Sequence, residues 1–140
     1  MKDIVTSIVS WSDKQSELTS VRRAVFIEEQ NVPESIELDD RDPFCHHVLA
    51  CDKAGCPIGI ARIDTNGKIG RMAVLSEYRG LGVGREMLRV IMDCGRANGI
   101  AEFHLSAQVS AVGFYEKMGF ETYGDEFEEA GITHINMRPR

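Results

Sequence analysis

The chain has 140 residues, a formal net charge of −6 and 27% charged residues. A chain of this length is expected to form a single domain over residues 1–140 and to bury about two thirds of its unfolded surface. The acidic charge argues against a nucleic-acid partner, because proteins that bind nucleic acids are usually basic. No apolar run reaches the about 20 residues that cross a bilayer, so no membrane partner is expected.

The four cysteines contain no C-x-x-C pair, and a chain of this size needs no disulfides for stability. The N-terminal residues lack the long apolar segment of a signal peptide. We therefore expect reduced thiols and a cytoplasmic protein. The sequence "CHHV" (residues 45–48) places thiol and imidazole groups side by side rather than at the spacing of zinc ligands, so no metal site is predicted.

The N-terminal third predicts a strand, a helix and a loop. A short apolar strand at residues 4–9 precedes "SDKQ" (residues 12–15), which has the form of a capping box and predicts a helix start at Ser12. An apolar stripe then recurs at helical spacing, ahead of Pro33: Leu18, Val21, Val25 and Phe26.

Acidic residues gather in two predicted loops. Residues 33–44 carry Glu34, Glu37, Asp39, Asp40 and Asp42, and a second group is formed by Glu126, Glu128 and Glu129. The negative electrostatic potential of these residues would attract amines or polyamines. A solvated acidic surface is the reading we favour, because charge runs usually behave in that way.

The remaining chain alternates strands and helices. Strands are predicted at residues 46–52, 58–64 and 68–74, followed by a helix after Gly84 with apolar residues on one face and a stop at residues 97–99. A strand at 101–107, a short helix at 110–119 and strands at 120–124 and 133–137 complete the pattern, with an acidic loop between the last two. The order β α β β β α β α β β indicates an α/β fold with one mixed sheet and helices packed against it.

The segment "YRGLGVGREM" (residues 78–87) places three glycines before a predicted helix. It lacks the Gly-Lys-Ser/Thr of a Walker loop, and Arg85 stands where a Rossmann fingerprint requires its third glycine. What remains is Arg79-x-x-Gly82-x-Gly84 at a helix N-terminus, where free N–H groups favour an anion such as a pyrophosphate. A glycine-rich turn without a ligand is the alternative.

Two motifs resemble the GNAT superfamily of N-acetyltransferases. "RGLGVG" (79–84) has the form of its acetyl-coenzyme A loop, and "AVGFYEKMGF" (111–120) is similar to its F-Y-x-K-x-G-F segment. The resemblance covers nearly the whole chain. Segments 21–33 and 128–137 also resemble the ElaA-like branch. The resemblance implies a GNAT-like acyl-CoA N-acyltransferase fold, with a central, mostly antiparallel twisted sheet flanked by helices.

The resemblance also implies the donor site. Backbone amides of the glycine loop would hold the pyrophosphate of acetyl-CoA, the cosubstrate, and the pantetheine arm would run along strand 68–74 as an added strand does. Backbone N–H groups near Ala73 would polarise the thioester carbonyl. The implied cofactor-binding residues are Met72, Ala73, Val74, Arg79, Gly80, Leu81, Gly82, Val83, Gly84 and Arg85.

The chemistry requires a base and an acid. An alkyl ammonium group must lose a proton before it attacks a thioester, and an imidazole is suited to accept it. By resemblance to the C-terminal strand of the glyphosate N-acetyltransferases, this base would be His134, and Tyr115 would protonate the departing thiolate. The alternatives are a structural histidine and a half-buried core tyrosine.

The acceptor is the least determined part. In glyphosate N-acetyltransferases two arginines hold an acidic acceptor, and Arg22 and Arg71 match them here, whereas Gln108 replaces a third arginine. Glu28 and Glu29 are further candidate ligands or bases. The resulting prediction is direct acetyl transfer from acetyl-CoA to a primary amine of a small molecule, in a chain that forms a homodimer if it follows many relatives. A non-catalytic acyl-CoA-binding regulatory module and a nucleotide-binding regulator are the alternatives.

Overall fold

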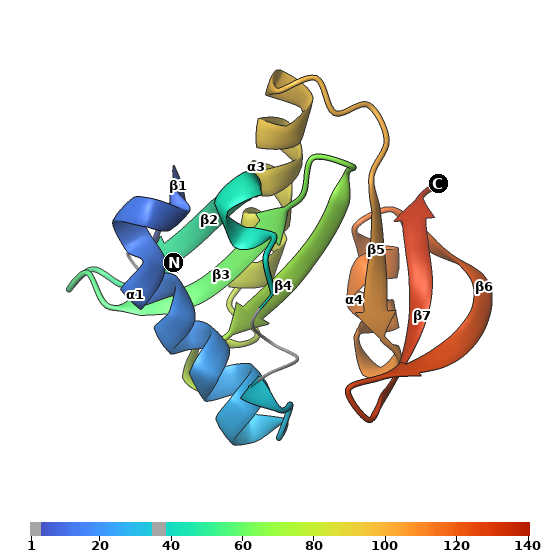
Figure 1. Cartoon of the computed structure of the whole chain (residues 1–140), viewed down its shortest axis with the longest axis horizontal. Helices are drawn as coiled ribbons and strands as arrows, with labels where there is room; N and C mark the ends of the chain where they lie inside the picture. Colours follow the sequence, from blue (N-terminus) through green and yellow to red (C-terminus); the bar gives the residue numbers. More distant parts are fainter. Residues whose placement is uncertain (1–3, 35–38) are drawn as a thin grey trace.

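The structure is a computed structural model that describes residues 4–34 and 39–140 (Figure 1). The first elements are β1 (Val5–Val9), α1 (Trp11–Arg22), the π-helix η1 (Arg23–Glu29) and the 3-10 turn η2 (Asp42–Phe44). The middle of the chain forms β2 (His46–Cys51), β3 (Pro57–Ile63), β4 (Lys68–Val74), η3 (Ser76–Tyr78) and α3 (Val83–Ala97). It ends with β5 (His104–Gln108), η4 (Val109–Ala111), α4 (Val112–Lys117), β6 (Phe120–Glu129) and β7 (Ile132–Pro139).

The strands form one seven-stranded sheet in the order β1-β2-β3-β4-β5-β7-β6. Within it β4 and β5 are parallel, and the other neighbouring pairs are antiparallel. The long α3 connects the parallel pair, as parallel strands require a crossover. The expected mixed, mostly antiparallel sheet flanked by helices is confirmed.

The pairing of β4 with β5 is short. Its register comprises Lys68 with His104 and Ile69 with Leu105. Just beyond, β4 carries one extra residue relative to β3, because Gly70 and Ala73 face two β3 residues that are only two positions apart. Arg71 in this bulge has a φ of 51°. From the bulge onward β4 turns away from β5, and Figure 1 shows the two strands separating.

Two apolar clusters cover the sheet. The predicted stripe Leu18, Val21, Val25 and Phe26 is buried against Leu49, Ile60 and Ala73. The predicted face of α3 is buried in the other cluster, which contains Val83, Met87 and Ile91 together with Phe120 and Met137. The helical periodicity therefore correctly predicted the packing faces of α1 and α3.

The helix start predicted at Ser12 is wrong. The N-cap is Ser10, which has an extended backbone and accepts a hydrogen bond from the Asp13 amide at 3.2 Å. Trp11 is therefore the first helical residue, and Ser12 lies inside the first turn. The helix then continues beyond Arg22 in π-helical form to Glu29.

The predicted acidic loop after residue 124 is also wrong. Strand β6 continues through it to Glu129 and pairs with β7 on both sides of a register irregularity between Tyr123 and Phe127. Gly124 has a φ of 74° at this irregularity. Because β6 lies at one edge of the sheet, its acidic side chains remain exposed while the backbone pairs with β7.

Candidate functional site

A cleft of about 590 Å³ opens where β4 and β5 diverge. Its walls come from β4, β5, the end of η1, α4 and the start of β7. The structure brings eight of the sequence-predicted site residues to this cleft: Arg71, Met72, Ala73, Val74, Arg79, Gln108, Tyr115 and His134. Residues from four separate elements and from the glycine loop thus meet at one place.

Two predicted acceptor residues lie elsewhere. Arg22 is 2% exposed and does not line the cleft, because Asp42 binds its guanidinium. Glu28 is exposed on η1 and also lies outside the cleft lining. The structure therefore does not support either residue as a direct acceptor ligand.

Arg79, the first residue of the glycine loop, lines the cleft, whereas residues 80–84 do not. Gly80 and Gly82 have φ values of 78° and 85°, which other residues rarely adopt. Gly82 is the N-cap of α3 and supplies no side-chain cap, so the first amides of the helix keep no side-chain partner. Val83 packs its side chain in the core, and its neighbours Gly84 and Arg85 continue the first turn. This end of α3 is suited to an anion.

Arg79 joins three parts of the site. Its Nε donates to the carbonyl of Val74 at 2.9 Å, and its two terminal nitrogens donate to the Glu29 carboxylate at 2.8 and 2.6 Å. The hydrogen bonds from Arg79 hold the pKa of Glu29 below its usual value. The arginine therefore links the end of β4, the glycine loop and the end of η1.

Tyr115 forms part of the cleft wall from α4. Its hydroxyl lies 3.6 Å from the sulfur of Met72, which is a weak acceptor, and its ring packs edge-on against Phe114 and Phe120. Burial raises the pKa of Tyr115 to about 12. The phenol is therefore protonated at neutral pH and has no strong hydrogen-bond acceptor among the described residues.

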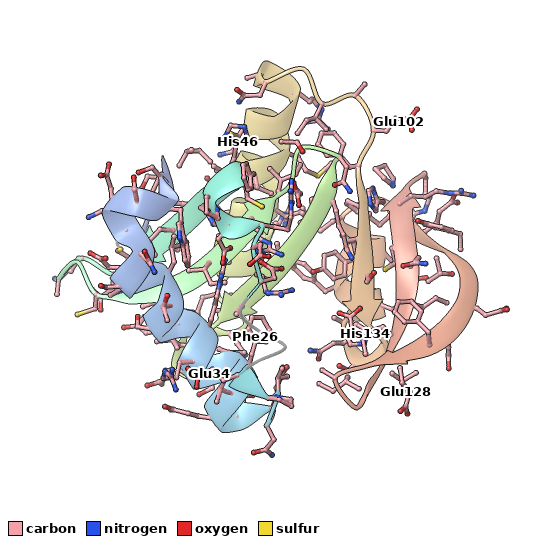
Figure 2. The ribbon with its side chains drawn as sticks, in the orientation of Figure 1. Phe26, Glu34, His46, Glu102, Glu128 and His134 are labelled. Atoms are coloured by element: carbon pink, nitrogen blue, oxygen red, sulfur yellow. The ribbon has the colours of Figure 1, made fainter. Side chains whose placement is uncertain are left out.

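His134 lies at the start of β7, beside the end of β5 (Figure 2). Its Nδ1 is 2.7 Å from the carbonyl oxygen of Ile132, and its ring stacks on Phe127. A carbonyl can only accept, so Nδ1 carries the proton and the neutral ring keeps its lone pair on Nε2. An imidazole held in this tautomer can accept a proton within the cleft.

Gln108 makes a contact across the cleft that the sequence did not predict. Its Nε2 donates to Oε1 of Gln30 at 2.8 Å, which joins the end of β5 to the residue that follows η1. Gln30 lines the cleft and lies four positions after Phe26, on the same face as the apolar stripe. This four-residue spacing from Phe26 was the feature of the sequence that could have predicted Gln30 at the cleft.

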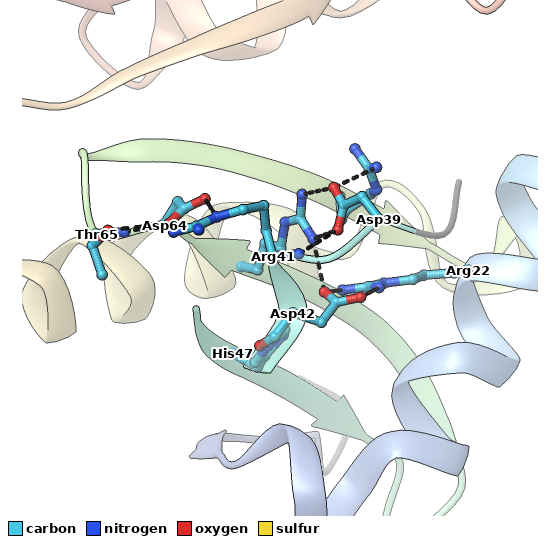
Figure 3. Close-up of polar contacts among 9 residues, drawn as sticks. Arg22, Asp39, Arg41, Asp42, His47, Asp64 and Thr65 are labelled. Carbon is cyan, nitrogen blue, oxygen red and sulfur yellow. Dashed lines mark hydrogen bonds and ion pairs between the residues drawn. The ribbon is translucent and has the colours of Figure 1, made fainter. Parts of the chain in front are cut away.

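A chain of arginines and aspartates closes the other end of the site (Figure 3). Asp42 accepts two hydrogen bonds from Arg22 and one from Arg62, at 2.8 to 2.9 Å. Arg62 also binds both oxygens of Asp39, and Arg71 contacts the same carboxylate at 3.2 Å. This ion-pair network holds the segment that follows residue 38 against β3 and β4.

The network corrects the prediction of a solvated acidic loop. Asp42 is 2% exposed and Asp39 is 30% exposed at its side chain. Burial opposes the ionisation of Asp42, but the hydrogen bonds and charges of Arg22 and Arg62 outweigh it and lower its pKa. Asp40 and Glu34 are exposed as predicted, and Glu37 lies outside the described residues. An arginine inside the apolar strand β3 was the sequence signal for a buried acidic partner.

His47 supports the same segment. Its Nε2 donates to the main-chain oxygen of Asp42 at 2.9 Å, and its ring stacks on Trp11. Burial lowers the pKa of His47, so the ring is neutral at physiological pH. Among residues 4–34 and 39–140, no group of three or more His, Cys, Asp and Glu side chains is placed to hold a metal ion. No helix in these ranges is long and apolar enough to span a membrane.

Comparison with known proteins decides the family. The profile of the GNAT acetyltransferase domain matches residues 14–140. The chain belongs to the GNAT acetyltransferase family. The uncharacterized N-acetyltransferase YjcF of Bacillus subtilis is 36% identical over 121 residues, which cover 84% of this chain and 86% of YjcF. The ElaA protein of Escherichia coli is 32% identical over 127 residues, covering 86% of this chain and 83% of ElaA.

Solved structures of GNAT relatives show the same fold. The crystal structure of E. coli ElaA matches with a TM-score of 0.85 at 27% identity, covering 98% of this chain and 99% of ElaA. An acyl-CoA N-acyltransferase from Pseudomonas aeruginosa matches with a TM-score of 0.86 at 25% identity and the same coverage. The expected GNAT fold and the ElaA-like branch are confirmed. Membership in this family makes the chain an acetyltransferase that uses an acyl-CoA cosubstrate.

We predict that Asp42→Asn lowers the free energy of unfolding at pH 7 by about 3–5 kcal/mol, because it leaves buried arginine charge uncompensated. Urea unfolding of the variant and wild type measures this difference. The difference in stability between wild type and variant should become smaller as the pH falls below about 4. The pKa of Asp42 is lowered in the folded protein, so the carboxylate stabilises the wild type only until it takes up a proton.

Glu34→Gln is the matched control. Glu34 pairs with Arg23 at the surface, where both side chains are about half exposed, so its loss should change stability by less than about 1 kcal/mol. Equal effects of the two variants would show that the ion-pair network does not hold the segment in place.

Proposed function

We propose that this single-domain protein transfers an acetyl group directly from acetyl-CoA to a primary amine of a small molecule. The observation that carries the proposal is the cleft at the divergence of β4 and β5. There a tyrosine hydroxyl and an imidazole whose Nδ1 faces the Ile132 carbonyl flank a β4 edge whose pairing with β5 has ended. These are the groups that amine acetylation by a thioester requires.

The donor would lie along β4 with its diphosphate at the glycine loop. The α3 N-terminus offers amides without a side-chain cap, and Gly80 and Gly82 hold the loop in the conformation that exposes such amides. The edge of β4 at Met72 and Ala73 no longer pairs with β5, and the pantetheine arm would lie along it as an added strand does, ending where the Val74 carbonyl accepts a hydrogen bond from Arg79. Arg79 lies between these two parts.

In the reaction the acceptor nitrogen attacks the thioester carbon, and its proton passes to Nε2 of His134. A C–N bond forms while negative charge develops on the carbonyl oxygen. Main-chain N–H groups near Ala73 would donate to this oxygen, a type of stabilisation typically worth a few kcal/mol. The C–S bond then breaks, and Tyr115 gives its proton to the departing thiolate.

The acceptor would occupy the part of the cleft between η1, β5 and the β6–β7 turn. Apolar side chains of Phe26 and Val32 line it together with Arg71, Gln108 and His134. We propose Arg71 and Gln108 as acceptor-contacting residues, since both lie on the cleft wall. This mixed lining suits a small amine that also carries polar groups.

The donor site predicts a thermal shift. Acetyl-CoA at 100 times its Kd should add about 2.7 kcal/mol of stability and raise the Tm. Gly82→Glu should abolish the shift, because a carboxylate at the helix start repels the diphosphate. Gly99→Glu is the matched control, since Gly99 also has a φ of 85° and open space around it but lies at the far end of α3.

If millimolar acetyl-CoA does not raise the Tm of the wild type, the proposed donor site is wrong. Binding without turnover across a broad panel of amines would instead identify a non-catalytic acyl-CoA-binding module.

Tyr115→Phe should reduce kcat by about 10²-fold or more, because the thiolate then leaves without a general acid. The thermal shift with acetyl-CoA should persist, since the ring remains. Tyr78→Phe makes the same chemical change outside the cleft, where the hydroxyl contacts Asp52. A Tyr115→Phe enzyme with wild-type kcat would disprove the acid role.

His134→Asn should reduce kcat/KM by about 10²-fold or more at neutral pH. The asparagine amide can still donate to the Ile132 carbonyl, so folding is preserved while the proton acceptor is lost. The pH profile of kcat/KM should also change, because the group that accepts the proton is lost. A pH profile identical to that of wild type would assign the base to another group.

A further inference from the structure

Arg79 uses three of its five N–H donors in contacts within the protein. Its Nε donates a hydrogen bond to the carbonyl of Val74, and its two terminal nitrogens donate to the two carboxylate oxygens of Glu29. A diphosphate at the neighbouring glycine loop would need these same terminal nitrogens. One guanidinium cannot present that pair of donors to two anions at once.

Glu29 is held firmly enough to compete. It is the last residue of η1, and the amide of the next residue, Gln30, closes the helix by bonding to the Val25 carbonyl at 3.0 Å. The Gln30 side chain is fixed in turn to Gln108. The carboxylate of Glu29 therefore projects toward Arg79 from a backbone whose next residue is anchored through both its amide and its side chain.

The pair remains accessible to a ligand. The side chains of Arg79 and Glu29 are 43% and 42% exposed, and Arg79 lines the cleft. The bond from its Nε to Val74 does not involve the terminal nitrogens, so it can stay in place while these nitrogens change partner. Exchange of one anion for another at Arg79 thus needs no movement of β4.

We propose that Glu29 is a positioning residue that competes with the diphosphate of the coenzyme for Arg79 and thereby lowers the affinity for the donor. The inference rests on the proposed acetyl-CoA site. The Glu29 carboxylate orients and neutralises Arg79, and phosphate oxygens of the donor would displace this carboxylate from the terminal nitrogens. Glu29 sets how tightly coenzyme A is retained.

The test is isothermal titration of coenzyme A at low ionic strength, with wild type, Glu29→Gln, Arg79→Gln and the double variant. Exposed ion pairs stabilise by small amounts, so Glu29→Gln should tighten binding by about two- to fivefold. Arg79→Gln should weaken binding. The double variant should equal Arg79→Gln, because without the arginine there is nothing for Glu29 to withhold.

Two controls separate competition from a general charge effect. Glu77→Gln removes the same charge two residues before Arg79, where the carboxylate contacts Ser76 instead, and it should leave the Kd within about 1.5-fold of wild type. Binding of S-acetylpantetheine, which has no diphosphate, should not respond to Glu29→Gln. A purely structural role for the pair would lower the Tm of both single variants without tightening coenzyme A.

Unchanged or weaker coenzyme A binding in Glu29→Gln would overturn the proposal, as would additive effects in the double variant. If wild type binds coenzyme A while Glu29→Gln shows no gain, the donor site stands and only the competition fails. If wild type and every variant fail to bind coenzyme A, the donor site itself falls, and the role of Glu29 falls with it.

Discussion

The pairing of β4 with β5 ends after two residue pairs, and the site depends on that break. An extra residue in β4 at Arg71 and Met72 alters the direction of the strand directly after Ile69. The backbone that would have paired with β5 is left as an open edge inside the protein rather than at the border of the sheet. Tyr115 and His134 reach the resulting cleft from elements that follow β5.

Side chains from the segment before β2 also support the bulge of β4. Here the support is electrostatic: Asp39 and Asp42 bring the segment before β2 against Arg62 and Arg71. A buried carboxylate is costly unless its charge is matched, and Arg22 together with Arg62 provides the match. Asp39 and Asp42, which the composition alone suggests are surface charges, thus help to build the site.

The end of η1 adds a second constraint. Two consecutive residues reach opposite walls: Glu29 binds Arg79 beside β4, and Gln30 binds Gln108 on β5. The helix that covers one face of the sheet therefore also spans the opening of the cleft. Because both contacts involve side chains at a helix terminus, they can be exchanged for ligand contacts at lower cost than contacts in the two apolar clusters.

The sequence by itself determined the order of the strands and the main helices, the packing faces of α1 and α3, and the position of the glycine loop, because periodicity and positive-φ glycines are local properties. The family resemblance also singled out Tyr115 and His134, which the structure places on the wall of the cleft, and their chemical roles stay predictions. The partners of Asp42, the withdrawal of Arg22 from the acceptor site and the contact of Gln30 with Gln108 were decided by tertiary structure. These pairs join residues 20 and 78 positions apart, and their energies depend on burial and geometry that only the folded sheet creates.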